Sequence, residues 1–153
     1  MATLLTASML RRISLGRVVE RAAAVLPATT QTAYYTIAGG RVMITAFVGE
    51  FTVAASGTAT NLTLVGNPTT GTDVNLCTAT AITSKELGTL FGPTGLFSDA
   101  LNVANAGALS GFSRPIILPV GTLDFLTSAT NTGQTKSWLT YIPIDDGATV
   151  VAA

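Results

Sequence analysis

The amino-acid sequence predicts an all-β chain that folds as a β-sandwich or jelly roll. Threonine, valine, glycine and alanine recur throughout, as in "TATNLTLVG" and "TSATNTGQT", and β-branched residues favour strands. Charged residues make up only 10% of the 153 residues, so the lysine and glutamate typical of helix surfaces are scarce. Turn signals recur about every eight to twelve residues between short apolar segments, which is typical of antiparallel sandwiches.

The N-terminal segment differs from the rest of the chain. We expect residues 1–16 to form an N-terminal arm whose apolar residues allow one or two amphipathic turns, and residues 17–153 to form the β-sandwich domain. Such a short arm does not fold alone, so it should order against the body or a neighbouring molecule. The segment "RVVERAAAVL" fits a helix or a strand; we expect a strand, because the next segment of the chain is clearly β, and Pro27 ends it.

Residues 33–48 predict a β-hairpin. The strand "AYYTIA" is followed by Gly39 and Gly40, which accept the positive φ of a two-residue turn, and then by "RVMITAFV". Strict alternation in the second strand separates two sets of side chains, Val42, Ile44, Ala46 and Val48 against Met43, Thr45 and Phe47. Both sets are largely apolar, so we expect both faces of this strand to be covered, by a facing sheet and by another chain or the arm.

The remaining segments complete the predicted sandwich. Gly49 and Glu50 predict a turn, and "TNLTLVG", "DVNLCTAT" and "TKSWLTYIPI" predict strands. Residues 93–113 predict a long loop with a helical turn near residues 99–103, and long loops are often functional or interfacial. "RPIILPVGTLDFLTS" predicts two strands separated by a turn near Val120 and Gly121, and "DDGATVV" predicts a turn and a last short strand.

Charge is distributed unevenly along the chain. The formal net charge is zero, but four arginines against Glu20 give the first 21 residues +3, which leaves −3 for the remainder. A neutral chain is not typical of nucleic-acid binding, which needs a basic surface. The arginines either bind a partner or form a solvated basic arm; the candidate partner-binding residues are Arg11, Arg12, Arg17 and Arg21.

Catalytic and metal-binding residue types are few. The chain has no histidine and one cysteine, which excludes His-dependent triads and zinc sites built from Cys and His. Cys77 is interpreted as a buried structural residue. Asp145 and Asp146 precede Gly147 and are typical of a turn. We therefore expect no enzymatic activity and no catalytic, cofactor-binding or metal-binding residues.

We expect no export or membrane-targeting signal in the sequence. The apolar residues of "MATLLTASMLRR" precede its arginines, the reverse of a signal peptide, and the longest uncharged runs are broken by Pro, Gly, Thr and Asn. We expect a protein with no membrane partner, made in a reducing cytoplasm. One binding alternative stays open, a carbohydrate platform built from aromatic residues, namely Trp138, Tyr34, Tyr35 and Tyr141.

Three segments within about residues 17–153 follow one another in a characteristic order, and they are "YYTIAGGRVMITAFVGEFT", "NPTTGTDVNLC" and "PVGTLDFLTSATNTGQTKSWLTYIPIDDGATV". Their order resembles small structural proteins of tailed bacteriophages, including capsid decoration, or cement, proteins. This resemblance implies a jelly-roll-like β-sandwich, often trimeric, that sits on the outer capsid surface and binds across junctions of the major capsid protein. The arm would then reach onto the shell or a neighbouring copy. The alternatives are a tail or head-fibre component and a carbohydrate-binding adhesin module.

Overall fold

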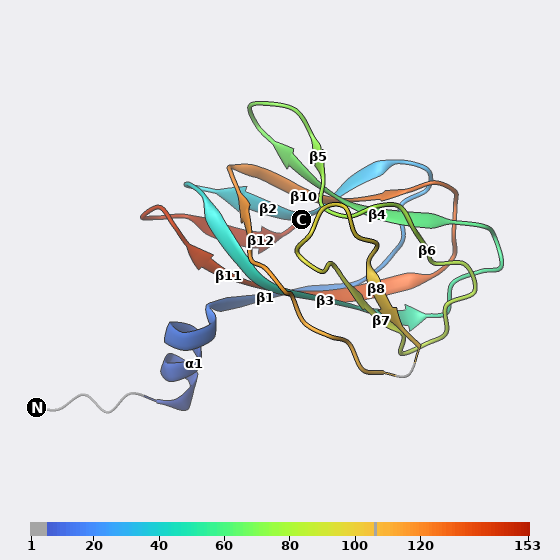
Figure 1. Ribbon diagram of the computed structural model, residues 1–153, viewed down its shortest axis with the longest axis horizontal. Helices are drawn as coiled ribbons and strands as arrows, with labels where there is room; N and C mark the ends of the chain where they lie inside the picture. The colour runs from blue at the N-terminus through green and yellow to red at the C-terminus, as the bar shows by residue number, and fades with distance from the viewer. Residues whose placement is uncertain (1–5, 106) are drawn as a thin grey trace, which may run out of the picture.

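Two antiparallel β-sheets pack face to face around an apolar core (Figure 1). The computed structural model describes residues 6–105 and 107–153, and helix α1 (Ala7–Leu15) is its only helix within those ranges. The predicted all-β sandwich is therefore confirmed.

We name the two sheets after a central strand of each. The β3 sheet runs in the order β1 (Arg17–Val25), β11 (Gln134–Pro143), β3 (Val42–Val53), β7 (Leu90–Gly92) and β8 (Asn102–Ala104), and β9 (Ile116–Leu118) also pairs with β3. The β10 sheet runs in the order β12 (Thr149–Ala152), β2 (Gln31–Ala38), β10 (Gly121–Thr127), β4 (Asn61–Pro68) and β5 (Val74–Asn75), and β6 (Thr80–Ala81) also pairs with β4.

Strands β1 to β4 and β10 to β12 alternate between the two sheets. Strands β1 and β3 lie in the β3 sheet while β2 and β4 lie in the β10 sheet, and β10, β11 and β12 alternate in the same way. The order β1-β11-β3-β7 facing β2-β10-β4-β5 is compatible with the expected jelly roll, whose finer classification stays a prediction. The segment from Arg17 to Val25 is a strand, as expected, and forms one edge of the β3 sheet.

Aromatic side chains from both sheets fill the centre of the core. The ring of Phe91 lies 6.4 Å from that of Phe47, 5.5 Å from that of Phe51 and 6.0 Å from that of Phe125, measured between centroids. Phe51, Phe91 and Phe125 are fully buried. Large apolar side chains of this kind supply the burial that stabilises a sandwich.

The predicted hairpin at Gly39 and Gly40 is wrong. Strands β2 and β3 belong to different sheets, so the two glycines turn the chain across the sandwich. Their φ angles of 76° and 149° still require glycine. The two glycines therefore do mark a turn, but the strands on either side of it do not pair with each other. Asp145 joins this turn to the one after β11: its carboxylate accepts from the backbone N, Nε and Nη2 of Arg41 at 2.8, 2.9 and 2.7 Å.

The Arg41–Asp145 contact should make stability depend on pH. The hydrogen bonds from the Arg41 side chain, followed by that from its backbone N–H, lower the pKa of Asp145 from 3.8 to about 2. Because the pKa is lower in the folded state, the stabilisation is present at neutral pH and is lost as pH falls from about 4 to about 2. Asp145→Asn should therefore be less stable than the native protein at neutral pH, with the difference shrinking in acid.

Urea unfolding of both proteins across this pH range measures the effect. Asp146→Asn is the matched control, because Asp146 is exposed and the contact with Arg41 is made by Asp145. A stability gap for Asp145→Asn that stays constant down to about pH 2 would contradict the assignment.

The predicted turn at Gly49 and Glu50 is also wrong. Strand β3 continues without a break from Val42 to Val53. Gly49 is a strand glycine that lies directly under the ring of Phe91, where a Cβ would overlap three ring carbons. A glycine inside a strand often marks such a close approach.

A β-bulge changes which β3 side chains face the core. Thr140 of β11 pairs with Ala46 and Tyr141 pairs with Ile44, so Thr45 is an extra residue. Val42 and Ile44 face the core as expected, but after the bulge the buried residue is Phe47 in place of Ala46. The expectation of strict alternation along 42–48 is therefore wrong, since an inserted residue reverses the faces.

The loop expected over residues 93–113 contains a strand. Residues 102–104 form β8, which pairs with β7, and the helical turn expected near residues 99–103 is not found there. The partner strand supplies hydrogen bonds that sequence periodicity alone did not indicate.

Candidate interaction surface

Helix α1 projects from the body of the sandwich (Figure 1). It begins at the N-cap Thr6, whose Oγ1 accepts a hydrogen bond from the Met9 backbone N–H at 3.3 Å, and it ends at Gly16. None of its residues is buried. A helix this short is marginal in water unless an apolar face is packed.

The helix carries an exposed apolar face. Met9, Leu10 and Ile13 follow one another at the spacings that share a helix face, and they are 42%, 49% and 68% exposed. Leu15 and Val18 extend the apolar surface to the start of β1, at 60% and 63% exposed. We call these five residues the arm patch. Contiguous exposed apolar residues mark interaction sites.

The junction between helix and sandwich is specifically built. Gly16 has φ 98°, and a Cβ there would overlap the backbone of Tyr141, so glycine is required. The Thr45 hydroxyl contacts two carbonyl oxygens, that of Leu15 at 3.1 Å and that of Thr140 at 3.3 Å. The bulged residue of β3 therefore anchors the end of the helix, which is a role that the sequence pattern did not indicate.

The four candidate arginines do not form one cluster. Arg11 and Arg12 lie exposed on α1, and Arg17 lies exposed at the start of β1. Arg21 instead turns inward: its Cζ lies 3.8 Å from the ring centroid of Tyr34. The structure therefore places three of the four beside the arm patch and assigns the fourth to packing between the sheets.

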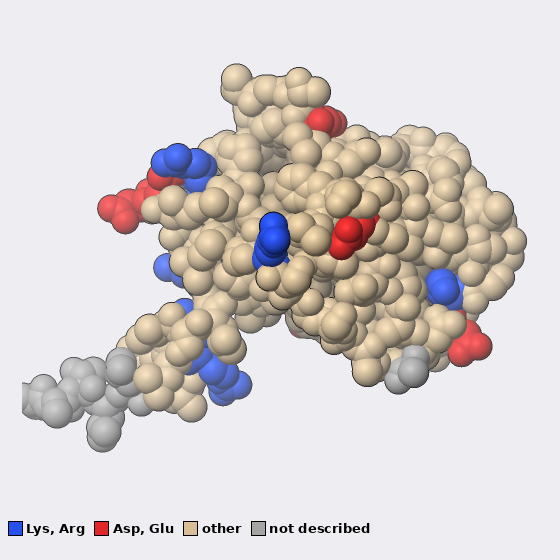
Figure 2. Space-filling view, in the orientation of Figure 1, with Lys and Arg blue, Asp and Glu red and all other residues tan. Residues whose placement is uncertain are grey.

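The rest of the visible surface is thinly charged. Figure 2 shows acidic and basic side chains, singly or in small groups, separated by broad uncharged areas, with basic side chains where the helix joins the body. The described residues form two ion pairs, Arg41–Asp145 and Lys136–Glu20. A neutral surface of this kind suits contact with other protein surfaces more than contact with nucleic acid.

Trp138 contacts two charged side chains. Its indole N–H donates to Glu20 Oε2 at 3.2 Å, and the Lys136 ammonium lies 5.0 Å from its ring centroid. The hydrogen bond from Lys136, and then that from Trp138, lower the pKa of Glu20. A sugar platform needs an open aromatic face, so Trp138 is poorly placed for one.

The three tyrosines are unsuited to the same role. Tyr34, Tyr35 and Tyr141 are at most 3% exposed. Tyr35 shares a 2.8 Å hydrogen bond with Ser137, and burial raises its pKa to about 12. The three tyrosines that suggested carbohydrate binding are therefore core residues in this structure.

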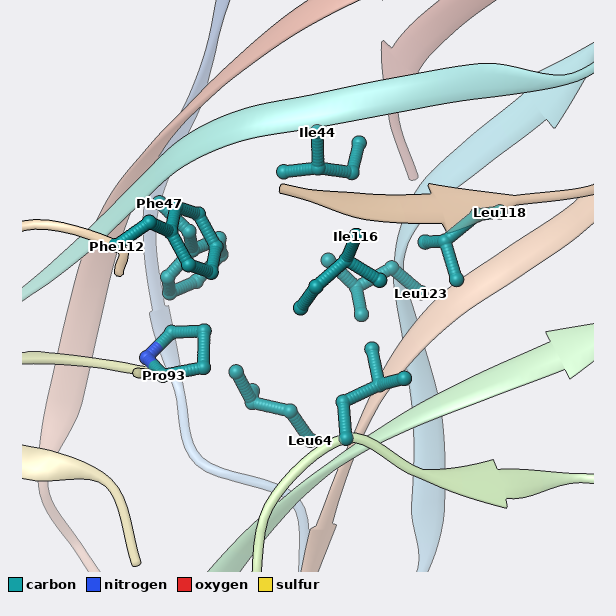
Figure 3. Close-up of a pocket in the computed structure, with 9 residues that line it drawn as sticks. Ile44, Phe47, Leu64, Pro93, Phe112, Ile116, Leu118 and Leu123 are labelled. Carbon is teal, nitrogen blue, oxygen red and sulfur yellow. The ribbon is translucent and has the colours of Figure 1, made fainter. Parts of the chain in front are cut away.

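A pocket beneath the 93–115 segment is lined only by apolar side chains (Figure 3). The residues around it come from both sheets and from the covering segment, and they are Ile44, Phe47, Leu64, Leu76, Pro93, Phe112, Ile116, Leu118 and Leu123. It offers no donor, acceptor or ionisable group to position a substrate. We interpret it as a packing gap in the core.

Reactive groups are not gathered elsewhere in the described ranges. Cys77 is buried, and burial raises the pKa of its thiol, which disfavours the reactive thiolate. Over residues 6–105 and 107–153, no three His, Cys, Asp or Glu side chains converge as a metal-binding group. No helix in that part of the chain is long and apolar enough to span a bilayer.

Comparison with protein-family models, with curated proteins and with solved structures gave no match. The arm patch and its anchored junction are therefore the features on which a functional proposal rests.

Proposed function

We propose that the chain is a structural protein of bacteriophage particles, specifically a capsid decoration protein on the outer capsid surface. In this proposal it forms homo-oligomers, expected to be trimers, and binds across junctions of the major capsid protein. The observation that carries the proposal is the helix held away from the sandwich with its apolar face unpacked. The resemblance of the sequence motifs to phage structural proteins indicates the class of partner, a major capsid protein.

The geometry of the arm supports binding to another protein molecule. Gly16 and Thr45 fix the end of the helix against the β3 sheet, so the arm is presented in a defined direction. Its apolar residues are flanked by Arg11, Arg12 and Arg17, while the chain after residue 21 carries net −3. An apolar surface with a basic rim fits a groove with an acidic rim on a neighbouring protein.

Deleting residues 1–16 should abolish binding to phage particles while leaving the sandwich folded, because no residue of α1 is buried in it. The measurement is the amount of chain bound to purified particles after sedimentation, with circular dichroism as the folding check. The double variant Leu10→Ser and Ile13→Ser should weaken binding strongly, since it removes the centre of the apolar face.

A matched control separates the helix from other exposed apolar residues. Leu87 is 68% exposed, as is Ile13, but it lies on a distant loop, so Leu87→Ser should leave particle binding unchanged. Normal decoration by the truncated protein would refute the role of the arm. Low copy number, confined to tails, would favour the tail-component alternative.

A further inference from the structure

A buried carboxylate lies on the outer side of the β10 sheet, away from the arm. Asp124 alternates along β10 with Leu123 and Phe125, which face the core, so its side chain points the other way. Even so, Asp124 is only 3% exposed. Gln31 links it to the segment between β4 and β5, which ends at Asp73.

Four oxygen-bearing side chains meet at this point. Gln31 Nε2 lies 2.8 Å from Asp73 Oδ2 and 2.8 Å from Asp124 Oδ2. Asn67 Nδ2 lies 3.0 Å from the same Asp124 oxygen. One amide group of Gln31 thus bridges two carboxylates from different segments. We call these four residues the Asp124 cluster.

The cluster has no positive charge to balance its carboxylates. Neither Asp73 nor Asp124 forms an ion pair with any described residue. The second carboxylate oxygen, Asp124 Oδ1, is shielded from solvent and has no hydrogen-bond partner in the described structure. A buried anionic oxygen without donor or cation is costly, which points to a ligand that supplies positive charge.

We propose that the Asp124 cluster binds a divalent cation, and specifically calcium. Two carboxylates supply hard oxygen ligands, and half a turn of the terminal amide of Gln31 or Asn67 presents a further oxygen in place of the nitrogen. Water completes the roughly six to eight ligands of calcium on the exposed side of Asp73. Ligands from a connecting segment and from the long side chain of Gln31 adapt to calcium more readily than to the strict octahedron of magnesium.

Sequence reasoning did not find this site, because its residues are 31, 67, 73 and 124 and have no spacing motif. The site also falls outside a search for three acidic, histidine or cysteine groups, since two of its members are amides. A cation here would link the segment before β5 to strands β2 and β10. The inference is independent of the proposed role in phage particles.

The test uses the full-length protein with calcium chloride as the probe. Isothermal titration calorimetry should detect one calcium site per chain, and saturating calcium should raise the Tm by about 5 °C, with a smaller rise for magnesium. Asp73→Asn should abolish both effects and still fold, because Asp73 is exposed. Asp124→Asn should abolish them as well.

Asp146→Asn is the matched control: it removes an exposed carboxylate at a turn outside the cluster, and calcium should act on it as on the native chain. Absence of calcium binding in the native protein would overturn the proposal. So would calcium binding that survives in Asp73→Asn. If Asp124→Asn does not fold, calcium binding by Asp73→Asn alone tests the proposal.

Discussion

Replacing Gly49 with alanine should lower the free energy of unfolding by about 2–3 kcal/mol, because the new methyl group has no space. The Cβ would overlap three ring carbons of Phe91, and Phe91 is itself fully buried beside the rings of Phe47, Phe51 and Phe125. The ring cannot move without disturbing the centre of the sandwich. Urea unfolding followed by circular dichroism measures the loss.

Gly57→Ala is the matched control for this substitution. At Gly57 the nearest atom to an added methyl group is Ser84 Oγ at 3.8 Å, which is an ordinary contact. Combining Gly49→Ala with Phe91→Leu should cost less than the sum of the two single changes, because the smaller side chain relieves the overlap. Equal stability of Gly49→Ala and Gly57→Ala would show that the close approach is unimportant.

Replacing Asn131 with leucine should cost about 2–4 kcal/mol, because two backbone N–H groups would lose their acceptor. Asn131 is 1% exposed, and its Oδ1 accepts from Ser56 N at 2.9 Å and from Gly133 N at 3.0 Å. Its Nδ2 donates to Thr60 Oγ1 at 3.2 Å. One side chain therefore joins the connection before β4 to the turn before β11.

Thermal unfolding of Asn131→Leu tests this role, with Asn105→Leu as the control at an exposed position. Asn131→Asp keeps the acceptor and should retain part of the stability that leucine loses. A Tm for Asn131→Leu equal to that of the control would contradict the assignment.

Local sequence patterns predicted where the strands lie better than which strands pair with each other. Alternation and turn residues indicated the strands around Tyr34, Leu64 and Trp138, which are present. The same signals placed Gly39 and Gly40 in a hairpin, whereas the turn joins strands of two sheets. A turn residue reports backbone φ and carries no information on which strand becomes the neighbour.

Long-range contacts also explain what was missed at the candidate sites. The basic arm was evident from charge alone, but the inward turn of Arg21 depends on Tyr34 lying in the facing sheet. Anchoring of the helix depends on Thr45, which is an ordinary strand residue in the sequence. The Asp124 cluster likewise joins residues from separate strands and a connection, which no linear pattern brings together.

The bulge in β3 makes the strand sensitive to length as well as to composition. Deleting the extra residue, Thr45, would leave Val42, Ile44 and Phe47 in regular alternation on the core face, but it would remove the hydroxyl that contacts the end of α1. A single-codon deletion elsewhere in β3, away from the bulge, would instead move the apolar residues on one side of it to the other face of the sheet. Within β3, loss of Thr45 should therefore preserve the sandwich and loosen the arm, whereas single deletions away from the bulge should disturb the core.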